Sequence, residues 1–495
     1  MQRMLIAGDW VDSSNGRSRP ILNPGTGEPI DEVPLATEAD VLRAVKAAQL
    51  GKAAMRALPA HKRAQILIAT AGRMERDLPE LALLLASENG KPIRQTREEV
   101  AAAARIFRGF GEEAKRLFGR TIPMDAIPGM ERHVAMTIRQ PIGVVAAIVP
   151  FNYPVELWAH KAAAALAAGN ALISKPPSPC PLTLLRIAAI LEDEGLPRNA
   201  HQMITGPGEM IGSLLAQSEG VQIITVTGSV ETGISLSRLA VGQLKRVFAE
   251  LGGNDATIVC ADADLDKAAE GIVLGRLARG NGQICCSVKR VFVHSSVYDE
   301  LARKLTDWCA RLVVGDQLLE TTDVGPLISE QAAVEVCGLI DRAVADGAKV
   351  AAGGGRHGAF VDPTVLTDVP TDTPLFREET FGPVVPLVRF DTIDQAIEMA
   401  NDSPFGLQAA VFTSDISTAM NVAYRLEAGG VMINWGSALR AETLPFGGVK
   451  FSGLGREAIH DTLIEMTEQK SIVIHNALAA PSDESVLSNA ERADR

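Results

Sequence analysis

The segment Ile142-Gly143-Val144-Val145-Ala146-Ala147-Ile148-Val149 opens the part of the chain whose pattern decides the fold. It is an unbroken apolar run, as expected for a strand buried on both faces of a parallel sheet. Further short apolar runs predict strands at Ala171–Ser174, His201–Thr205 and Ile223–Thr227. Segments of helical pattern separate the strands, at 157–168, 182–191, 209–217 and 232–239. The alternation predicts a doubly wound parallel sheet with helices on both faces.

The regions on either side of this sheet extend the α/β pattern. Residues 36–120 carry apolar side chains at helical spacing and predict helices. A second alternating block, about 254–433, predicts a second α/β domain with strands at Ala256–Val259, Arg290–Val293 and Val384–Val388.

Two strands are predicted outside both blocks. Residues 132–139 alternate as a strand with two different faces would, and Ser471–His475 is a short apolar segment near the end of the chain. The residues from 477 to 495 are small and polar, and they predict a disordered tail.

The size and composition of the chain exclude several classes of protein. A chain of 495 residues is too long for one hydrophobic core and predicts two or three domains. The net charge of −12 provides no basic face for nucleic acid or for an anionic membrane. No apolar stretch is long enough to span a bilayer, and the first residues show no secretory signal, so a cytoplasmic protein is expected.

The six cysteines are too few for a disulfide framework and show no CxxC spacing, which indicates reduced thiols. No metal-binding motif stands out. The run Gly280-Asn281-Gly282-Gln283-Ile284-Cys285-Cys286-Ser287 places one thiol in a glycine-rich loop, where a substrate carbonyl can approach closely. With Glu250 at the head of a second glycine-rich turn, this favours covalent thiol catalysis with a carboxylate base. The alternative is that Cys285 and Cys286 are two small buried residues.

Together these segments resemble the aldehyde dehydrogenase superfamily, from about residue 5 to residue 475. The motifs that carry the resemblance follow one another in order along the chain: Pro150–Pro154, Lys175-Pro176, Thr227–Ser229 with Gly233, Glu250–Gly253, Gly282–Cys285, Glu378–Pro383, and Pro445–Gly448 with Ser452–Glu457. One such match alone would be weak. The whole ordered set implies a Rossmann-type dinucleotide domain, a second α/β catalytic domain and a small β oligomerisation element.

The resemblance implies a role for each catalytic residue. Cys285 is the nucleophile that forms a thiohemiacetal and then a thioester, Asn152 donates to the oxyanion, and Glu250 activates the water that hydrolyses the thioester. Lys161 and Glu457 match a pair that assists proton movement. Taken singly, Asn152 could be a turn residue, Glu250 an exposed acid, and Lys161 and Glu457 plain surface charges.

The resemblance also implies an NAD or NADP site. The turn from Thr227 to Gly233 lies between a strand and a helix, where a pyrophosphate can meet a helix N-terminus, although as a bare motif it is weak and could be a simple helix cap. Many members that prefer NAD carry a glutamate three positions after the lysine that binds ribose, and this chain has Ser178 there, so NADP is expected to be tolerated or preferred. The expected cofactor-binding residues are Lys175, Ser178, Gly228, Ser229, Gly233, Glu379, Phe381 and Phe151.

The substrate is expected to be a small polar or anionic aldehyde. The segments 151–161 and 435–455 look most like the lactaldehyde, non-phosphorylating glyceraldehyde and semialdehyde branch. Arg440, with Arg105 or Arg108, could pair an acidic group on the substrate through two parallel hydrogen bonds, or each arginine could simply form a surface salt bridge. Aromatic residues make up only 4% of the chain, too few for a stacking pocket.

Two other functions stay open at this point. One is a CoA-acylating relative, whose members typically lack the base that Glu250 would supply, and the other is a binding or structural protein that has lost its activity. The expected domains are 1–122 with 142–251 for the dinucleotide, 252–464 for catalysis, and 123–141 with 465–476 for oligomerisation. An exposed edge strand at 471–475 favours a homodimer or homotetramer.

Overall fold

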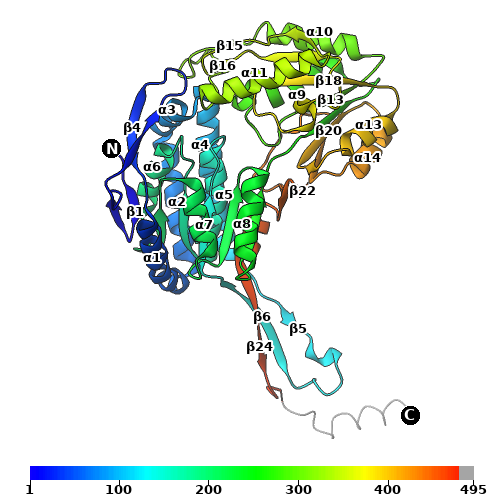
Figure 1. Cartoon of the computed structure of the whole chain (residues 1–495). Helices are drawn as coiled ribbons and strands as arrows, with labels where there is room; N and C mark the ends of the chain where they lie inside the picture. Colours follow the sequence, from blue (N-terminus) through cyan, green and yellow to red (C-terminus); the bar gives the residue numbers. More distant parts are fainter. Residues whose placement is uncertain (479–495) are drawn as a thin grey trace, which may run out of the picture.

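The computed structural model describes residues 1–478, and most of the predicted disordered tail, 479–495, lies outside the described residues. An eight-stranded sheet forms the first layer, in the order β2-β1-β9-β8-β7-β10-β11-β23 (Figure 1). Its strands are β1 (Met4–Ile6), β2 (Asp9–Val11), β7 (Val144–Ile148), β8 (Ala171–Lys175), β9 (His201–Met203), β10 (Ile223–Thr227), β11 (Arg246–Glu250) and β23 (Gly453–Leu454). The five strands from β9 to β11 in this order are parallel, as the sequence predicts.

Helices cover both faces of this sheet, because alternate strand residues point to opposite sides. Val144 and Ala146 pack with one set of helices, and Val145 and Ala147 pack with the other. The first set is α1 (Glu38–Ala57), α7 (Gly208–Gln217) and α8 (Val230–Val241). The second is α2 (Ala60–Arg76), α3 (Leu78–Asn89), α4 (Ile93–Glu113), α5 (Pro154–Ala168), α6 (Leu182–Asp193) and α15 (Ile459–Glu465).

A seven-stranded sheet forms the upper part of the molecule, in the order β14-β17-β18-β13-β12-β20-β21 (Figure 1). Its strands are β12 (Ala256–Val259), β13 (Arg290–His294), β14 (Lys349–Ala352), β17 (Thr364–Thr367), β18 (Val384–Phe390), β20 (Gln408–Phe412) and β21 (Gly430–Ile433). The helices α9 (Leu265–Ile272) and α10 (Tyr298–Cys309) contribute to the core on one side, and α11 (Glu330–Ala345), α12 (Pro374–Arg377), α13 (Ile393–Asn401) and α14 (Ile416–Arg425) to the core on the other. This is the second α/β block expected from the sequence.

A three-stranded sheet, β24-β6-β5, projects from the body as an arm (Figure 1). Its strands are β5 (Thr121–Ile122), β6 (Val134–Pro141) and β24 (Thr467–Ile474), and all eight residues of β24 pair antiparallel with β6. Two segments that are far apart in the sequence therefore form one ribbon. Short paired strands complete the fold: β3 (Ser18–Leu22) with β4 (Pro29–Pro34), β15 (Arg356–His357) with β16 (Phe360–Val361), and β19 (Phe405–Gly406) with β22 (Val449–Lys450).

Three features of the first sheet are absent from the sequence-based prediction. The antiparallel strands β1 and β2 extend one edge, and β11 continues the other edge beyond β10. The short strand β23 pairs antiparallel with β11, next to Glu250, although its residues were expected inside the catalytic domain. These strands are only two to five residues long, so the periodicity of their sequence cannot predict them. They are defined by hydrogen bonds to strands that are distant in the sequence.

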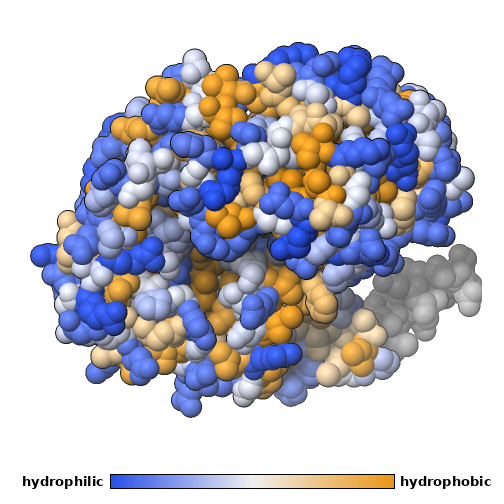
Figure 2. Space-filling view, turned by 45° about the horizontal axis from the view of Figure 1, so that its top comes forward, coloured by the Kyte–Doolittle hydropathy of each residue, from blue (hydrophilic) through white to orange (hydrophobic). Residues whose placement is uncertain are grey.

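The aldehyde dehydrogenase-like α/β architecture expected from the sequence is present. Among residues 1–478, no helix combines the length and the apolar character needed to cross a membrane. A recess crosses the middle of the face drawn in Figure 2, and apolar side chains line part of it.

Candidate active site

Cys285 lies at the end of a loop with an unusual backbone. A six-residue π-helical turn, Val273–Ala278, leads into Gly280, Asn281 and Gly282, and these three residues all have positive φ angles (58°, 54° and 73°). A methyl group on Gly282 would collide with the backbone of Gly382. The glycine is therefore required, because it lets the loop pack directly against the segment from 378 to 383.

A buried arginine holds this loop in place. Arg276 donates hydrogen bonds to the carbonyl oxygens of Gly282 (3.1 Å), Thr380 (3.0 Å) and Val384 (2.8 Å), and to Oγ of Ser287 (2.7 Å). It forms no ion pair with a carboxylate in the part of the chain that is described. The guanidinium of Arg276 thus fixes the loop by donating its N–H groups to backbone carbonyl and hydroxyl oxygens.

Cys285 and Asn152 line the same pocket. Its other lining residues are Tyr153, Glu156, Leu157, Arg279, Ile284, Cys286, Ala438 and Arg440. Asn152 follows β7 and precedes α5, and its side-chain Oδ1 is buried without a hydrogen-bond partner in the described structure. A thiol and a side-chain amide therefore line one cavity.

Glu250 ends strand β11 beside this pocket. Its backbone carbonyl accepts a hydrogen bond from Gly228, while its side-chain Oε2 is buried and lacks a partner among residues 1–478. Burial, followed by the nearby charge of Glu457, raises the pKa of Glu250 well above its usual range, and Cys285 contributes in the same direction. A carboxyl group with a raised pKa can accept a proton near neutral pH.

Lys161, Glu457 and Arg440 form a buried charged network. Lys161 Nζ lies 2.9 Å from Glu457 Oε2, Arg440 pairs with the other oxygen of Glu457, and Arg440 Nε lies 3.7 Å from Glu156 Oε1. Although burial acts in the opposite direction, Lys161 and Arg440 hold the pKa of Glu457 well below its usual value. The plain surface-charge alternative does not apply, because both Lys161 and Glu457 are buried.

The environment of Cys285 disfavours a free thiolate in the ligand-free enzyme. The neighbouring thiol of Cys286, followed by burial, raises the pKa of Cys285 well above its usual value, and only the charge of Lys289 opposes this. Cys285 therefore needs a proton acceptor or a bound ligand before it can attack. The alternative of two buried structural cysteines fits Cys286 but not Cys285, which is partly exposed to the pocket.

Lys289 connects three parts of the site. Its Nζ donates to the carbonyl oxygens of Gly253 (2.6 Å) and Cys285 (2.8 Å), and it forms an ion pair with Glu379. The same carboxylate oxygen of Glu379 accepts the backbone N–H of Gly253 (2.9 Å). Lys289 is absent from the sequence-based predictions. A lysine four positions after the cysteine, at the start of a buried strand, was the available signal.

Several of the expected cofactor residues follow the carboxyl ends of strands of the first sheet, whereas Glu379 and Phe381 lie before β18 of the second. Lys175 ends β8, and burial, followed by the charge of Arg19, lowers its pKa to about 8. Its Nζ donates to Ser178 Oγ (3.1 Å), and no carboxylate pairs with it among residues 1–478. Ser178 in turn donates to the carbonyl of Gly206 (3.2 Å). A lysine without an acidic partner suits an oxygen-rich ligand at this edge.

The turn after β10 has the features of a pyrophosphate site. Ser229 caps the twelve-residue helix α8 by accepting the backbone N–H of Thr232, Gly228 before it is only partly buried, and Gly233 packs against Leu251 inside that helix. The hydroxyl of Thr227 is buried and lacks a partner in the described structure. The helix N-terminus and the orphaned hydroxyl fit a bound dinucleotide.

Two aromatic rings and Glu379 lie where the nicotinamide end is expected. The ring centroids of Phe151 and Phe381 are 6.3 Å apart and tilted by 59°. Lys289 lies 5.0 Å from the centroid of Phe381, and a side chain at Gly252 would collide with the carboxylate of Glu379. The residues expected for the cofactor are thus brought together, and they fit an NAD or NADP molecule.

The candidate substrate arginines differ from one another in their surroundings. Arg440 lines the pocket of Cys285, but two carboxylates already balance its charge. Arg105 lines the adjoining hollow and pairs with Glu442, while Arg108 pairs with Glu75 on α2 and is absent from the lining of the described pockets. For Arg105 and Arg108 the structure shows the surface salt bridges that the sequence analysis kept as the alternative.

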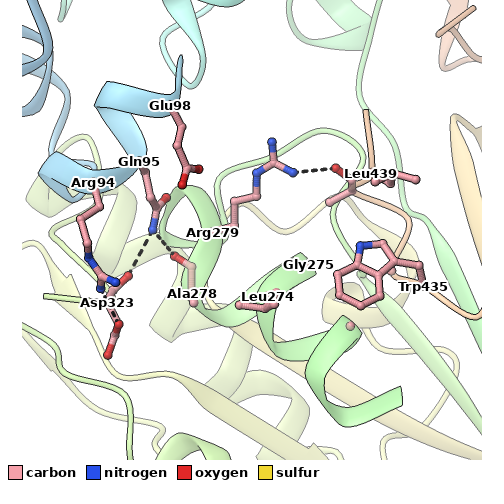
Figure 3. A pocket seen from close by; sticks show the side chains of 13 residues that line it. Arg94, Gln95, Glu98, Leu274, Gly275, Ala278, Arg279, Asp323, Trp435 and Leu439 are labelled. Atoms are coloured by element: carbon pink, nitrogen blue, oxygen red, sulfur yellow. Dashed lines mark hydrogen bonds and ion pairs between the residues drawn. The ribbon is translucent and has the colours of Figure 1, made fainter. Parts of the chain in front are cut away.

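Arg279, like Lys289, is a cation of the site that is absent from the sequence-based predictions. It lines the pocket of Cys285 and also a wider hollow of about 440 Å³ with Gln95, Leu274 and Trp435 (Figure 3). Its Nη1 donates to the carbonyl of Ala438 (2.9 Å), and it makes no ion pair within residues 1–478. The available signal was its position in the same glycine-rich segment as Cys285, six residues earlier.

Within residues 1–478, no group of three or more histidine, cysteine or acidic side chains is placed to hold a metal ion.

The family model described as "Aldehyde dehydrogenase family" matches residues 10–472. The chain is 40% identical to 3-sulfolactaldehyde dehydrogenase of Priestia aryabhattai over 95% of this chain and 98% of that protein. It is also 40% identical to glutarate-semialdehyde dehydrogenase of Pseudomonas putida over 96% of this chain and 98% of that protein.

A solved structure supports the same assignment. The crystal structure described as an NADP-dependent enzyme of Escherichia coli superposes with a TM-score of 0.93 at 38% identity, covering 96% of this chain and 98% of that one. This chain therefore belongs to the aldehyde dehydrogenase family, and it is an oxidoreductase that converts an aldehyde to a carboxylic acid with NAD or NADP through a thioester on a cysteine.

Proposed function

We propose that this enzyme oxidises a short aldehyde that carries a carboxylate or sulfonate group, with Cys285 as the nucleophile and NADP accepted at least as well as NAD. The observation that carries the substrate proposal is the guanidinium of Arg279, which forms no ion pair within residues 1–478 and lines the pocket of the Cys285 thiol. Two relatives have names that include an anionic aldehyde, a sulfolactaldehyde and a glutarate semialdehyde, which supports the same class.

The first chemical step forms a bond between Cys285 Sγ and the aldehyde carbon. Glu250 takes the thiol proton, and the carbonyl oxygen becomes an alkoxide that accepts hydrogen bonds from the side-chain amide of Asn152 and the backbone N–H of Cys285. Lys161 and Glu457, which are already ion-paired, provide a route by which the proton on Glu250 leaves the buried site.

A bound NAD(P)⁺ would supply the acceptor for the hydride that leaves this carbon, and loss of the hydride leaves a thioester on Cys285. Glu250 removes a proton from a water molecule, which attacks the thioester carbon and releases the carboxylic acid. The C–S bond breaks, and Cys285 is restored as a thiol or thiolate. Lys175, Ser178, Gly228, Ser229 and Glu379 would hold the dinucleotide.

Replacement of Glu250 tests the role of this carboxylate. Glu250→Gln should lower steady-state kcat on the order of 10²- to 10⁴-fold, because the general base is lost. In the native enzyme, kcat should fall as the pH falls through the pKa of Glu250, at a higher pH than for an ordinary carboxyl group, since burial and Glu457 raise that pKa. Stopped-flow absorbance of reduced nicotinamide measures both quantities.

Hydroxylamine or CoA added to Glu250→Gln separates hydrolysis from the earlier steps. Partial rescue of turnover by hydroxylamine is expected, because a strong nucleophile needs no base to release the acyl group, while the loss of Glu250 as acceptor of the thiol proton still slows formation of the thioester. Native enzyme that turns over only when CoA is added would show a CoA-acylating enzyme instead. The absence of any reduced nicotinamide with every aldehyde tried would favour the binding or structural alternative.

Arg279 and Arg440 are assigned different roles. An anion near Arg440 would have to compete with Glu156 and Glu457, whereas Arg279 forms no ion pair within residues 1–478 and feels the charge of Glu156 only at longer range. Arg279 therefore binds the acidic end of the substrate, and Arg440 keeps the charges of the proton route balanced.

Substitution of each arginine distinguishes these roles. Arg279→Ala should raise KM for succinate semialdehyde about 10- to 100-fold and leave KM for propanal nearly unchanged, because only the acidic substrate loses a charge-assisted hydrogen bond. Arg440→Ala should lower kcat for both aldehydes, and Arg105→Ala is the matched control with little effect on either. Equal changes in KM for both aldehydes in Arg279→Ala would refute the assignment.

The choice of cofactor is proposed to depend on Ser178. Ser178 is uncharged and accepts from Lys175, so nothing at this position repels a 2′-phosphate. Ser178→Glu should lower kcat/KM for NADP at least about tenfold while changing the value for NAD little, because like charges placed together are strongly unfavourable. Native enzyme with a large preference for NAD in the same assay would contradict the proposal.

The arm is proposed to join subunits into a homodimer or homotetramer. Strand β24 is an edge of its sheet, and Ile472, Val473 and Ile474 on it are 37%, 55% and 48% exposed. An apolar edge strand of this length favours pairing with another copy. Sedimentation velocity should show an oligomer for the native chain and a smaller species for Val473→Glu, with Val473→Thr as control; a monomeric native chain would contradict the proposal.

A further inference from the structure

A buried lysine outside the active-site motifs holds the backbone of the oxyanion residue. Lys91, between α3 and α4, donates from Nζ to the carbonyl oxygen of Asn152 at 2.6 Å. The same ammonium forms an ion pair with Glu99 and lies 3.8 Å from the ring centroid of Tyr153. The side chains of both charged residues are almost completely buried, at 1% and 0% exposed.

Glu99 holds the other side of the same turn. Its Oε1 accepts the backbone N–H groups of Val155 (2.8 Å) and Glu156 (3.4 Å) in the first turn of α5. The residue before that helix, Tyr153, supplies no side-chain cap. The carboxylate of Glu99 therefore takes the place of a capping residue and places a negative charge at the positive end of the helix.

A third contact extends this support to Phe151. Asn89, two residues before Lys91, donates from Nδ2 to the carbonyl oxygen of Phe151. Side chains from the segment 89–99 thus hold backbone groups before, at and after Asn152.

The side chain of Asn152 has no support of its own. It makes no hydrogen bond to another residue in the described structure, and its buried Oδ1 lacks a partner. The direction of its amide therefore depends on the backbone of the turn. A buried ion pair is weak evidence for stability, since apolar residues of similar size often serve as well, so the pair of Lys91 and Glu99 calls for another explanation.

We propose that Lys91 and Glu99 are positioning residues for acyl transfer: they fix the turn so that the amide of Asn152 points at the oxyanion formed on the substrate. The proposal rests on the oxyanion role proposed above for Asn152. Neither residue touches the substrate or the thiol; both act through Asn152.

The test compares a reaction that forms an oxyanion with one that does not. Lys91→Met keeps the length of the side chain and removes its charge and hydrogen bonds. It should slow the burst of reduced nicotinamide on the order of 10- to 100-fold, because a small misplacement of an oxyanion donor is costly. Alkylation of Cys285 by iodoacetamide forms no oxyanion, so its rate should stay within about twofold of the native value, and so should the Kd for NADP.

A double-mutant cycle shows whether Lys91 acts through Asn152. Asn152→Ala should slow the burst strongly, and Lys91→Met added to it should slow the burst little further, because the two changes remove one contribution. If Lys91→Met slows the burst in the Asn152→Ala background as much as it does in the native enzyme, the proposal is overturned. It is also overturned if Lys91→Met slows the burst and the alkylation of Cys285 by the same factor. If Asn152→Ala alone leaves the burst unchanged, the oxyanion role of Asn152 fails, and this proposal fails with it.

A matched control lies on helix α3, next to Asn89. Glu88 is also a fully buried carboxylate, and it accepts N–H groups from Leu182 and Thr183 in the first turn of α6, away from the turn of Asn152. Glu88→Gln should therefore leave the ratio of burst rate to alkylation rate unchanged, and a change as large as that in Lys91→Met would overturn the proposal. If Lys91→Met does not fold, Glu99→Gln replaces it in the double-mutant cycle with Asn152→Ala, and the same outcomes decide the proposal.

Discussion

The arrangement of this active site depends on the ammonium group of Lys289. It contacts the carbonyl oxygens of Cys285 and Gly253 and pairs with Glu379, so one charge joins the loop of the thiol, the turn after Glu250 and the carboxylate expected at the cofactor. These three segments come from different parts of the chain. Because the group is buried, each of its donors has to find an acceptor, and that requirement restricts where the segments can lie.

The surrounding residues extend the same principle. Arg276 fixes the loop of Cys285 against the segment 378–383 through carbonyl oxygens, and the backbone contact at Gly282 leaves no room for a side chain. Lys161 and Arg440 balance Glu457 beside Glu250. These buried charges are thus already balanced before a substrate binds. Within residues 1–478, Glu250 Oε2 has no hydrogen-bond partner, the side-chain amide of Asn152 makes no hydrogen bond to another residue, and Arg279 forms no ion pair, so these are the groups left available to a ligand.

Much of this could be predicted from the sequence. The strands at 144–148, 171–175 and 223–227 and the helices between them follow from uninterrupted apolar runs and helical spacing, which are local properties. Cys285, Asn152 and Glu250 could be found because each belongs to a motif in a fixed order. The substrate arginines could not be sorted in this way, because whether an arginine is free or paired depends on carboxylates that are distant in sequence, such as Glu75 for Arg108 and Glu457 for Arg440.

By itself, the sequence determined the α/β class, the family, and the residue types needed for thioester chemistry, because those depend on local pattern and on the order of the motifs. Only the tertiary structure decided which arginines are paired with carboxylates, which acceptors surround the buried Lys289 and Arg276, and how Lys91 and Glu99 reach the turn of Asn152. The physical reason is that a buried charge is defined by its partners, and here these partners come from segments that meet only when the chain has folded.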